Sequence, residues 1–129
     1  MAQVKIYGLR KNLSAIRPGL SDAIHESLML AFALPREKRF QRFIALDAED
    51  FVFPSDRSDS YTIVEISVFE GRSAEAKQRL ITTLFARVAE RCNLSAQDLE
   101  ITIFETPRAN WGIRGKPGDE LSLDYKVNV

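Results

Sequence analysis

Residues 60–71 read SYTIVEISVFEG and carry the strongest strand pattern in the chain. The stretch is rich in Thr, Tyr, Ile, Val and Phe, whose side chains suit a pleated and partly buried strand. Gly71 ends the stretch, and Ser73 follows as a candidate N-cap for a helix. The sequence therefore predicts a β-strand that passes through a short turn into an α-helix.

The residues that follow repeat at helical spacing and then return to a strand pattern. Six side chains form an apolar stripe with a period near 3.6 residues: Leu80, Ile81, Leu84, Phe85, Val88 and Cys92. The segment CNLSAQ at 92–97 interrupts this stripe, and DLEITIFE at 98–105 has the composition of a second strand. Residues 60–105 are thus predicted to form one strand–helix–strand unit.

The first half of the chain shows the same order of patterns. Residues 2–9 alternate like a strand, and RFQRFIAL at 39–46 predicts another. Between them we expect a helix with Ser14 as its N-cap, Pro18 in its first turn and Pro35 just after its end. Its apolar stripe consists of Ile16, Leu20, Ile24, Leu28 and Phe32.

Two such units predict a single α/β (α+β) domain over residues 1–129, with pseudo-repeats at about 2–46 and 60–105 and a C-terminal extension at 106–129. The units combine into a four-stranded sheet with both helices on one face. The other face would carry Val, Ile and Phe, so we expect further copies of the chain to cover it. The tail LSLDYKVNV at 121–129 alternates like an edge strand that pairs with a neighbouring subunit.

Composition narrows the classes of partner. Eighteen basic and eighteen acidic side chains cancel, and the isoelectric point is near 6.6. We therefore expect neither a nucleic-acid partner nor a membrane partner. The single cysteine, Cys92, cannot form an internal disulfide and is interpreted as packing, and the start of the chain has no signal-peptide pattern. A cytoplasmic protein without metal or cofactor is expected, with its one histidine, His25, at the surface.

Five segments, taken in order, resemble the tautomerase superfamily. The superfamily includes 4-oxalocrotonate tautomerase, macrophage migration inhibitory factor and malonate semialdehyde decarboxylase, and the likeness is greatest to the decarboxylase branch. The resemblance implies a homotrimer with three sheets around a central axis, helices outside and active sites near the subunit boundaries. The segments are AFALPREKRFQ (31–41), DRSDSYTIVEI (56–66), GRSAEAKQRL (71–80), DLEITIFE (98–105) and NWGIRG (110–115).

The chain departs from this family at the position that matters most. The family's general acid or base is the secondary amine of a proline that directly follows the initiator methionine, whereas residue 2 here is Ala2. The small size of Ala2 predicts removal of Met1, which would leave a primary amine in that place. A primary amine is a different base and forms imines with carbonyl compounds more readily. If Met1 stays, the amine moves one residue outward.

The resemblance also assigns roles to side chains away from the N-terminus. Arg72 matches an arginine that binds the substrate carboxylate, although the family's second arginine is replaced near Glu70. Trp111 matches an aromatic residue that walls the pocket. The alternatives are a solvated arginine beside a helix start and a tryptophan in the core.

The entrance to the second predicted strand carries several positive charges. Lys38 stands where the decarboxylase pattern has an aspartate that positions water, which argues against decarboxylation by the same route. Lys38, Arg39 and Arg42 would make the pocket mouth positive, with Arg39 a candidate substrate-binding residue. The alternative is an ordinary charged strand entry.

Two functions stay open at this stage. One is a keto–enol isomerase that acts on a small carboxylate-bearing oxo acid through the Ala2 amine, with Arg72 as anchor and Trp111 as pocket wall. The other is a non-catalytic trimer that kept the fold, and a ligand-binding or structural role, after losing the catalytic proline. The sequence alone does not decide whether the protein is an enzyme.

Overall fold

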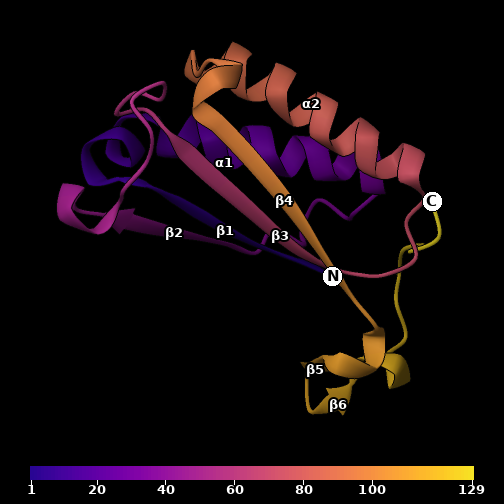
Figure 1. Cartoon of the computed structure of the whole chain (residues 1–129). Coiled ribbons are helices and arrows are strands. Elements are labelled where there is room, and N and C mark those ends of the chain that lie inside the picture. Colours follow the sequence, from indigo (N-terminus) through magenta and orange to yellow (C-terminus); the bar gives the residue numbers. More distant parts are fainter.

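The computed structural model describes residues 1–129 and shows a four-stranded sheet with two helices packed on one face (Figure 1). The main elements confirm the predicted pair of strand–helix–strand units. They are β1 (Ala2–Leu9), α1 (Arg10–Phe32), β2 (Gln41–Leu46), β3 (Thr62–Phe69), α2 (Ala74–Cys92) and β4 (Leu99–Thr106). The C-terminal extension adds a hairpin of β5 (Gly112–Ile113) and β6 (Lys116–Pro117). Single 3-10 turns lie at Ala48–Asp50, Ala96–Asp98, Arg108–Asn110 and Gly118–Glu120.

The strand order β2-β1-β3-β4 places the start of the chain in the middle of the sheet. Strands β1 and β2 are parallel, as are β3 and β4, and β1 runs antiparallel to β3. Ala2 pairs with Val68, and Val68 pairs with Glu105. The N-terminus, the end of β3 and the end of β4 therefore meet at one end of the sheet, where the C-terminal extension also begins (Figure 1).

One apolar layer between the sheet and the helices forms the core. Strands β1 and β3 contribute alternate side chains to it, and the two helices face them with one stripe each. Neither helix is both long enough and apolar enough to cross a bilayer. The fully enclosed members of this layer include Val4, Ile6, Leu13, Leu20, Ile24, Val64, Ile66, Leu80, Leu84 and Val88.

The uncovered face of the sheet is more polar than the sequence predicts. The valines of β1 and β3 point to the helices, so the other face receives the alternate residues of each strand. Lys5 and Glu65 lie opposite each other there, and opposite charges on paired strands stabilise the pairing. Ile63 and Phe104 are among the apolar side chains on this mixed face.

The first helix begins earlier than expected. It starts at Arg10, directly after β1, and its N-cap residue Leu9 makes no side-chain capping bond. The prediction of Ser14 as N-cap is wrong. The apolar stripe extends back to Leu13, which is completely buried, and burying this side chain requires the helix to begin before it. Pro18 consequently lies inside the helix, on an exposed part of its surface, where water can reach the main-chain oxygen that loses its partner.

The second helix confirms one prediction, and the tail follows its own subunit. Ser73 does cap α2, since its hydroxyl accepts a hydrogen bond from the Ala76 N–H at 3.1 Å. The tail does not form a strand within this chain, although its alternation of exposed and half-buried residues is present. Instead it returns along its own subunit, where Tyr125 packs on the core and the Ser73 N–H donates to the Val129 main-chain oxygen at 3.0 Å.

Candidate functional site

The start of the chain is enclosed by the fold. Met1 is only 7% exposed and Ala2 only 2%, because β1 lies in the middle of the sheet and the C-terminal extension passes beside its first residue. Chain ends of most domains are exposed and poorly ordered. A buried N-terminus places the α-amine largely among protein atoms.

The surroundings of this amine make it a weak base. Burial, and then the positive charges of Arg72, Arg108 and Lys38, lower the pKa of the Met1 α-amine from 8.0 to about 5, while Asp124 opposes the shift. Desolvation and like charges both disfavour the protonated form of an amine. The amine is therefore neutral at pH 7, with its lone pair available.

Arg72, in the loop between β3 and α2, is buried with unused hydrogen-bond donors. It is 5% exposed, which excludes the solvated alternative considered from the sequence. Its Nη1 donates to the Phe69 main-chain oxygen at 2.9 Å, and its guanidinium carbon lies 4.8 Å from the centre of the Phe32 ring. The Nε and Nη2 atoms have no partner. Burial lowers the pKa of Arg72 to about 10, with Glu105 opposing.

Such an arginine has donors that an anion could use. Buried donors are nearly always paired in folded proteins, so two unpaired nitrogens on one buried guanidinium require an explanation. The planar fork of arginine fits both oxygens of a carboxylate. A small carboxylate that reached Arg72 would supply the missing acceptors.

A pocket of about 260 Å³ opens beside the N-terminus. Its size suits a small organic acid, since drug-sized ligands occupy pockets of roughly 300–1,000 Å³. The hydroxyl of Tyr125 is buried without a partner, and Tyr125 belongs to the pocket wall. The lining consists of Met1, Lys38, Arg114, Ser122, Leu123, Asp124 and Tyr125.

Arg108 holds the extension over this end of the sheet. Its Nη2 donates to the main-chain oxygens of Gly118 at 3.0 Å and Leu121 at 2.8 Å. The guanidinium carbon also lies 5.4 Å from the centre of the Phe69 ring. Arg108 thus fixes the point from which the tail crosses the pocket, and its charge contributes to the field at the amine.

Trp111 packs behind the site and does not line the pocket. Its Nε1–H donates to the Thr106 hydroxyl at 2.7 Å, and its ring meets the Phe69 ring edge-on at 5.1 Å between centres. Because the Phe69 main-chain oxygen accepts from Arg72, Trp111 supports the residue that orients the anchor.

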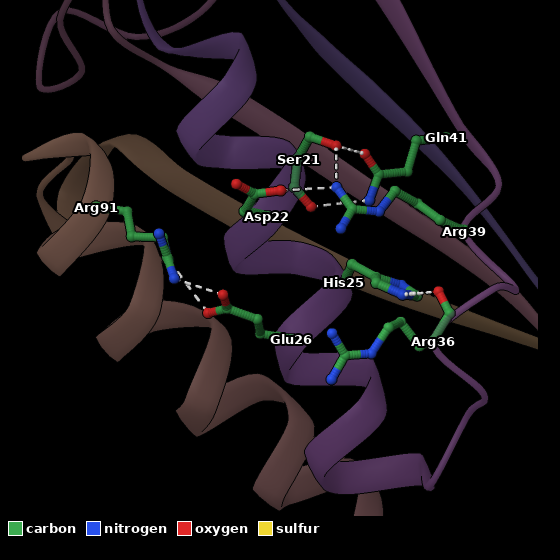
Figure 2. Close-up of polar contacts among 8 residues, drawn as sticks. All are labelled: Ser21, Asp22, His25, Glu26, Arg36, Arg39, Gln41 and Arg91. Carbon is green, nitrogen blue, oxygen red and sulfur yellow. Dashed lines mark hydrogen bonds and ion pairs between the residues drawn. The ribbon is translucent and has the colours of Figure 1, made fainter.

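The segment that leads into β2 is fastened to α1, as Figure 2 shows. His25 Nε2 lies 2.7 Å from the Arg36 main-chain oxygen, and since a carbonyl only accepts, Nε2 carries the hydrogen. The prediction of a surface histidine is wrong, because His25 is 2% exposed under this returning segment. The bond holds the chain two residues before Lys38, which lines the pocket.

Arg39 is not brought to the N-terminus. Its Nη1 makes an ion pair with Asp22 at 2.8 Å and donates to the Ser21 hydroxyl at 3.2 Å (Figure 2). It lines a separate hollow of about 350 Å³ together with Arg42 and three other residues. The structure therefore places Lys38, and not Arg39, beside Met1 in the pocket, whose lining does not include Arg72.

Arg108, Asp124 and Tyr125 were not recognised from the sequence. They reach the site because the extension leaves β4 and returns past the N-terminus, and no short motif records that path. The alternation of residues 121–129 was the one signal that the tail lies against protein with one side.

Two other groups have the chemistry of candidate sites. Asp47, Glu49 and Asp50 bring three carboxylates within 4.8 Å of one another, but all three are exposed on a loop and nothing else there points to a metal. Burial raises the pKa of the Cys92 thiol, which suits packing better than nucleophilic chemistry.

Comparison with known proteins gives a consistent result. Residues 38–114 match a family model, Tautomerase_2, described as tautomerase enzyme. The 2-hydroxymuconate tautomerase of Comamonas testosteroni is 32% identical over 57 residues, which are 44% of this chain and 90% of that protein. Malonate semialdehyde decarboxylase has a TM-score of 0.80 at 22% identity, covering 92% of this chain and 99% of that chain. A fused 4-OT symmetric trimer has a TM-score of 0.73 at 16% identity, covering 87% and 91%.

The family match includes the two side chains that the resemblance singled out beyond the N-terminus. Arg72 and Trp111 both lie within residues 38–114. Strand β1, which carries Ala2, lies before the matched region. The solved structures share the fold, including the doubled strand–helix–strand arrangement seen in Figure 1. Because the family model matches more than half of its residues, this chain belongs to the Tautomerase_2 family of tautomerase enzymes.

Proposed function

We propose that this protein moves a proton between carbon and oxygen of a small oxo or enol acid, with the N-terminal amine as proton carrier. One observation carries the proposal: a buried, neutral α-amine lies within the field of a buried arginine that has two unpaired nitrogens. A base and a carboxylate anchor are the two groups that keto–enol isomerisation of an oxo acid requires.

Each group has a defined task in this reaction. Arg72 binds the carboxylate and fixes the distance from the anchor to the reacting carbon. The amine accepts the enol proton and returns a proton to carbon. The positive charges of Lys38 and Arg108 favour the enolate that forms between these two transfers. Trp111 acts indirectly through Phe69.

We expect the rate to be low. The best proton carriers have a pKa near the working pH, whereas the pKa of the Met1 amine is about 5 and so lies below neutral pH. A primary amine at Ala2 or Met1 also lacks the rigid ring of a proline. The turnover of phenylenolpyruvate should therefore fall below the roughly 1–1,000 per second of typical enzymes.

We also propose that the protein assembles as a homotrimer through the uncovered face of its sheet. Apolar residues such as Phe104, which is 46% exposed, favour coverage of this face. The fused 4-OT structure described above is a trimer, which supports the same assembly here.

A second function is a carboxylate-binding trimer without catalysis. The observation that favours it is Ala2 in place of the family's proline. The two functions share Arg72 and differ in whether the amine moves protons, so they predict the same binding and different turnover.

One set of variants tests both functions. Calorimetric titration of small oxo acids and a phenylenolpyruvate assay would compare the wild type with Arg72→Ala. A charge-assisted pair of bonds is worth about 1.5–3 kcal/mol, so affinity should fall by roughly tenfold to a hundredfold. The matched control is Arg79→Ala, which removes an exposed arginine of α2 and should change neither readout.

The N-terminus provides the second arm. Mass spectrometry would first establish whether Met1 or Ala2 begins the mature chain. Ala2→Pro should raise turnover because it introduces a secondary amine once Met1 is removed. Binding without turnover in the wild type and in Ala2→Pro would select the non-catalytic function, and equal affinity in wild type and Arg72→Ala would refute the anchor.

A further inference from the structure

The tail at 121–129 is fastened only lightly to the rest of the protein. It runs from the β5–β6 hairpin back to the start of α2 (Figure 1). Beyond Leu121 it makes one hydrogen bond, in which the Val129 main-chain oxygen accepts from the Ser73 N–H at 3.0 Å. Its side chains alternate between half-buried and exposed, and none is fully buried. A segment with so few buried contacts and hydrogen bonds opens at a low cost in free energy.

Three buried donor atoms at this end of the protein have no partner. They are Nε and Nη2 of Arg72 and the hydroxyl oxygen of Tyr125. Tyr125 lines the pocket beside Met1, whereas Arg72 is not part of the lining. An acid that only filled the pocket would therefore not reach the guanidinium, and part of the surrounding protein has to move before Arg72 can bind a carboxylate.

The tail is the segment best placed to make this movement. It contacts the residues on both sides of Arg72, because Asn128 lies against Gly71 and Val129 bonds to Ser73. Arg72 lowers the pKa of the Met1 amine and Asp124 of the tail raises it, so both side chains lie near the same nitrogen. Opening the tail would separate it from the loop that carries Arg72.

We propose that residues 122–129 form a gate that opens to admit a small oxo acid to Arg72, and that Tyr125 on this gate donates a hydrogen bond to the oxo or enol oxygen when the gate closes. The proposal rests on the carboxylate site of the proposed function and adds a residue that recognises a second group of the ligand. Because the Tyr125 ring packs on the core, closure returns its hydroxyl to a fixed position.

An α-oxo acid satisfies both residues at once. Its oxo oxygen is on the carbon next to the carboxylate, so one small ligand offers an acceptor to Arg72 and another to Tyr125. The hydrogen bond from Tyr125 strengthens as negative charge builds on this oxygen in the enolate. A site that donates to an oxygen discriminates against the analogue that lacks it, because the donor is then left unpaired. Tyr125 would thus select oxo acids over simple carboxylates.

A comparison of two acids tests the role of Tyr125. Pyruvate has the oxo group and propionate lacks it, and calorimetric titration would measure the affinity of each for the full-length protein. Tyr125→Phe should weaken pyruvate binding about two- to tenfold. Propionate binding should stay nearly unchanged. The matched control is Tyr61→Phe, which removes a hydroxyl that donates to Glu100 at the other end of β3 and should change neither affinity.

Hydrogen exchange of the wild type tests the gate. The Ser73 amide is protected by the Val129 oxygen, so it exchanges when the gate opens. Pyruvate at about ten times its dissociation constant should slow this exchange about tenfold, because the ligand binds the closed form. The Asn93 amide, which donates to Ala89 at the far end of α2, is the control and should exchange at the same rate with and without pyruvate.

The outcomes separate this proposal from the proposed function. Equal losses of pyruvate and propionate affinity in Tyr125→Phe would make the residue a support of the pocket and overturn its role in recognition. Ser73 exchange that is the same with and without saturating pyruvate would overturn the gate. In either case, pyruvate binding that is lost in Arg72→Ala would leave the carboxylate anchor standing. A wild type that binds no oxo acid would refute both proposals.

Discussion

Arg72 is buried, charged and short of hydrogen-bond partners, so it lowers the free energy of unfolding of the protein without a ligand. Its one hydrogen bond to Phe69 and its position over the Phe32 ring offset only part of the desolvation of a guanidinium. This balance supports the proposal that Arg72 binds an anion. Stability and binding should therefore respond in opposite directions when the charge is removed.

Arg72→Met tests this opposition. Methionine keeps most of the length of the side chain without the charge, so the free energy of unfolding should rise by about 1–3 kcal/mol while carboxylate binding is lost. Urea unfolding of both proteins, compared at equal m-values, measures the change. Arg79→Met is the control and should stay within about 0.5 kcal/mol of the wild type. A marked loss of stability in Arg72→Met would show that the guanidinium is a structural support.

Single residues were predicted with uneven success. Arg72 was chosen from the sequence through a family motif, but its burial was not foreseen, because the Phe32 ring that packs against it comes from α1, in the other half of the chain. His25 was placed at the surface because it lies beside the apolar stripe of α1, and only the return of residues 33–40 over that side buries it. Local patterns do not record such long-range coverage.

At the scale of elements, the tail is the part of the fold that completes the site. It begins at the Arg108 hydrogen bonds to Gly118 and Leu121 and ends at the Ser73 bond to Val129. Between these two attachments it supplies four of the seven pocket-lining residues. The second attachment depends on Gly71, whose φ of +130° favours glycine and whose missing side chain makes room for Asn128.

Gly71→Ala should detach the end of the tail. A Cβ at this position would lie 2.8 Å from Asn128 Oδ1 and 3.0 Å from Val127 Cγ1, in a backbone conformation that alanine rarely adopts. We expect a loss of about 1–3 kcal/mol in unfolding free energy. Hydrogen exchange of the Ser73 amide should become faster, because its acceptor is the Val129 oxygen.

The matched control for this variant is Gly112→Ala. No atom lies within 4 Å of a Cβ built there, so neither stability nor Ser73 exchange should change appreciably. If Gly71→Ala exchanged its Ser73 amide at the wild-type rate, the tail would not depend on this glycine.

Element boundaries show where sequence patterns succeed. Residues 60–71 and 98–105 were predicted as strands because β-branched and aromatic residues are concentrated there, and both strands are present with slightly shorter or shifted ends. The start of α1 was misplaced because Ser14 and Pro18 look like helix-start residues, whereas the burial of Leu13 determines the first turn. Packing outweighed capping preference at this junction.

At the scale of the whole molecule, we expect the uncovered face of the sheet, and not the outer surface of the helices, to contact other subunits. Phe104 projects from β4 on the uncovered face, since its neighbours Ile101 and Ile103 pack on the core. Leu30 lies on the outer surface of α1 and is 59% exposed. Both are exposed apolar residues, but only Phe104 lies where the proposed trimer would form.

Phe104→Asp should weaken self-association, and Leu30→Asp should not. A carboxylate on a covered sheet face would have to be buried without a partner, at a cost of several kcal/mol per subunit. Light scattering at micromolar concentration should give a trimer for the wild type and for Leu30→Asp, and a smaller species for Phe104→Asp. A monomeric wild type would contradict the proposed assembly.

The enclosed N-terminus also limits the time during protein synthesis in which Met1 can be removed. Once β1 has paired with β3, an aminopeptidase can no longer reach Met1, which is 7% exposed. Strand β3 ends at Phe69, and ribosomes add about 5–20 residues per second, so the nascent chain offers its first residue for roughly 3–14 seconds before that pairing is complete. Whether Met1 or Ala2 carries the terminal amine therefore depends on the relative rates of methionine removal and translation, and each molecule keeps the outcome for as long as it stays folded.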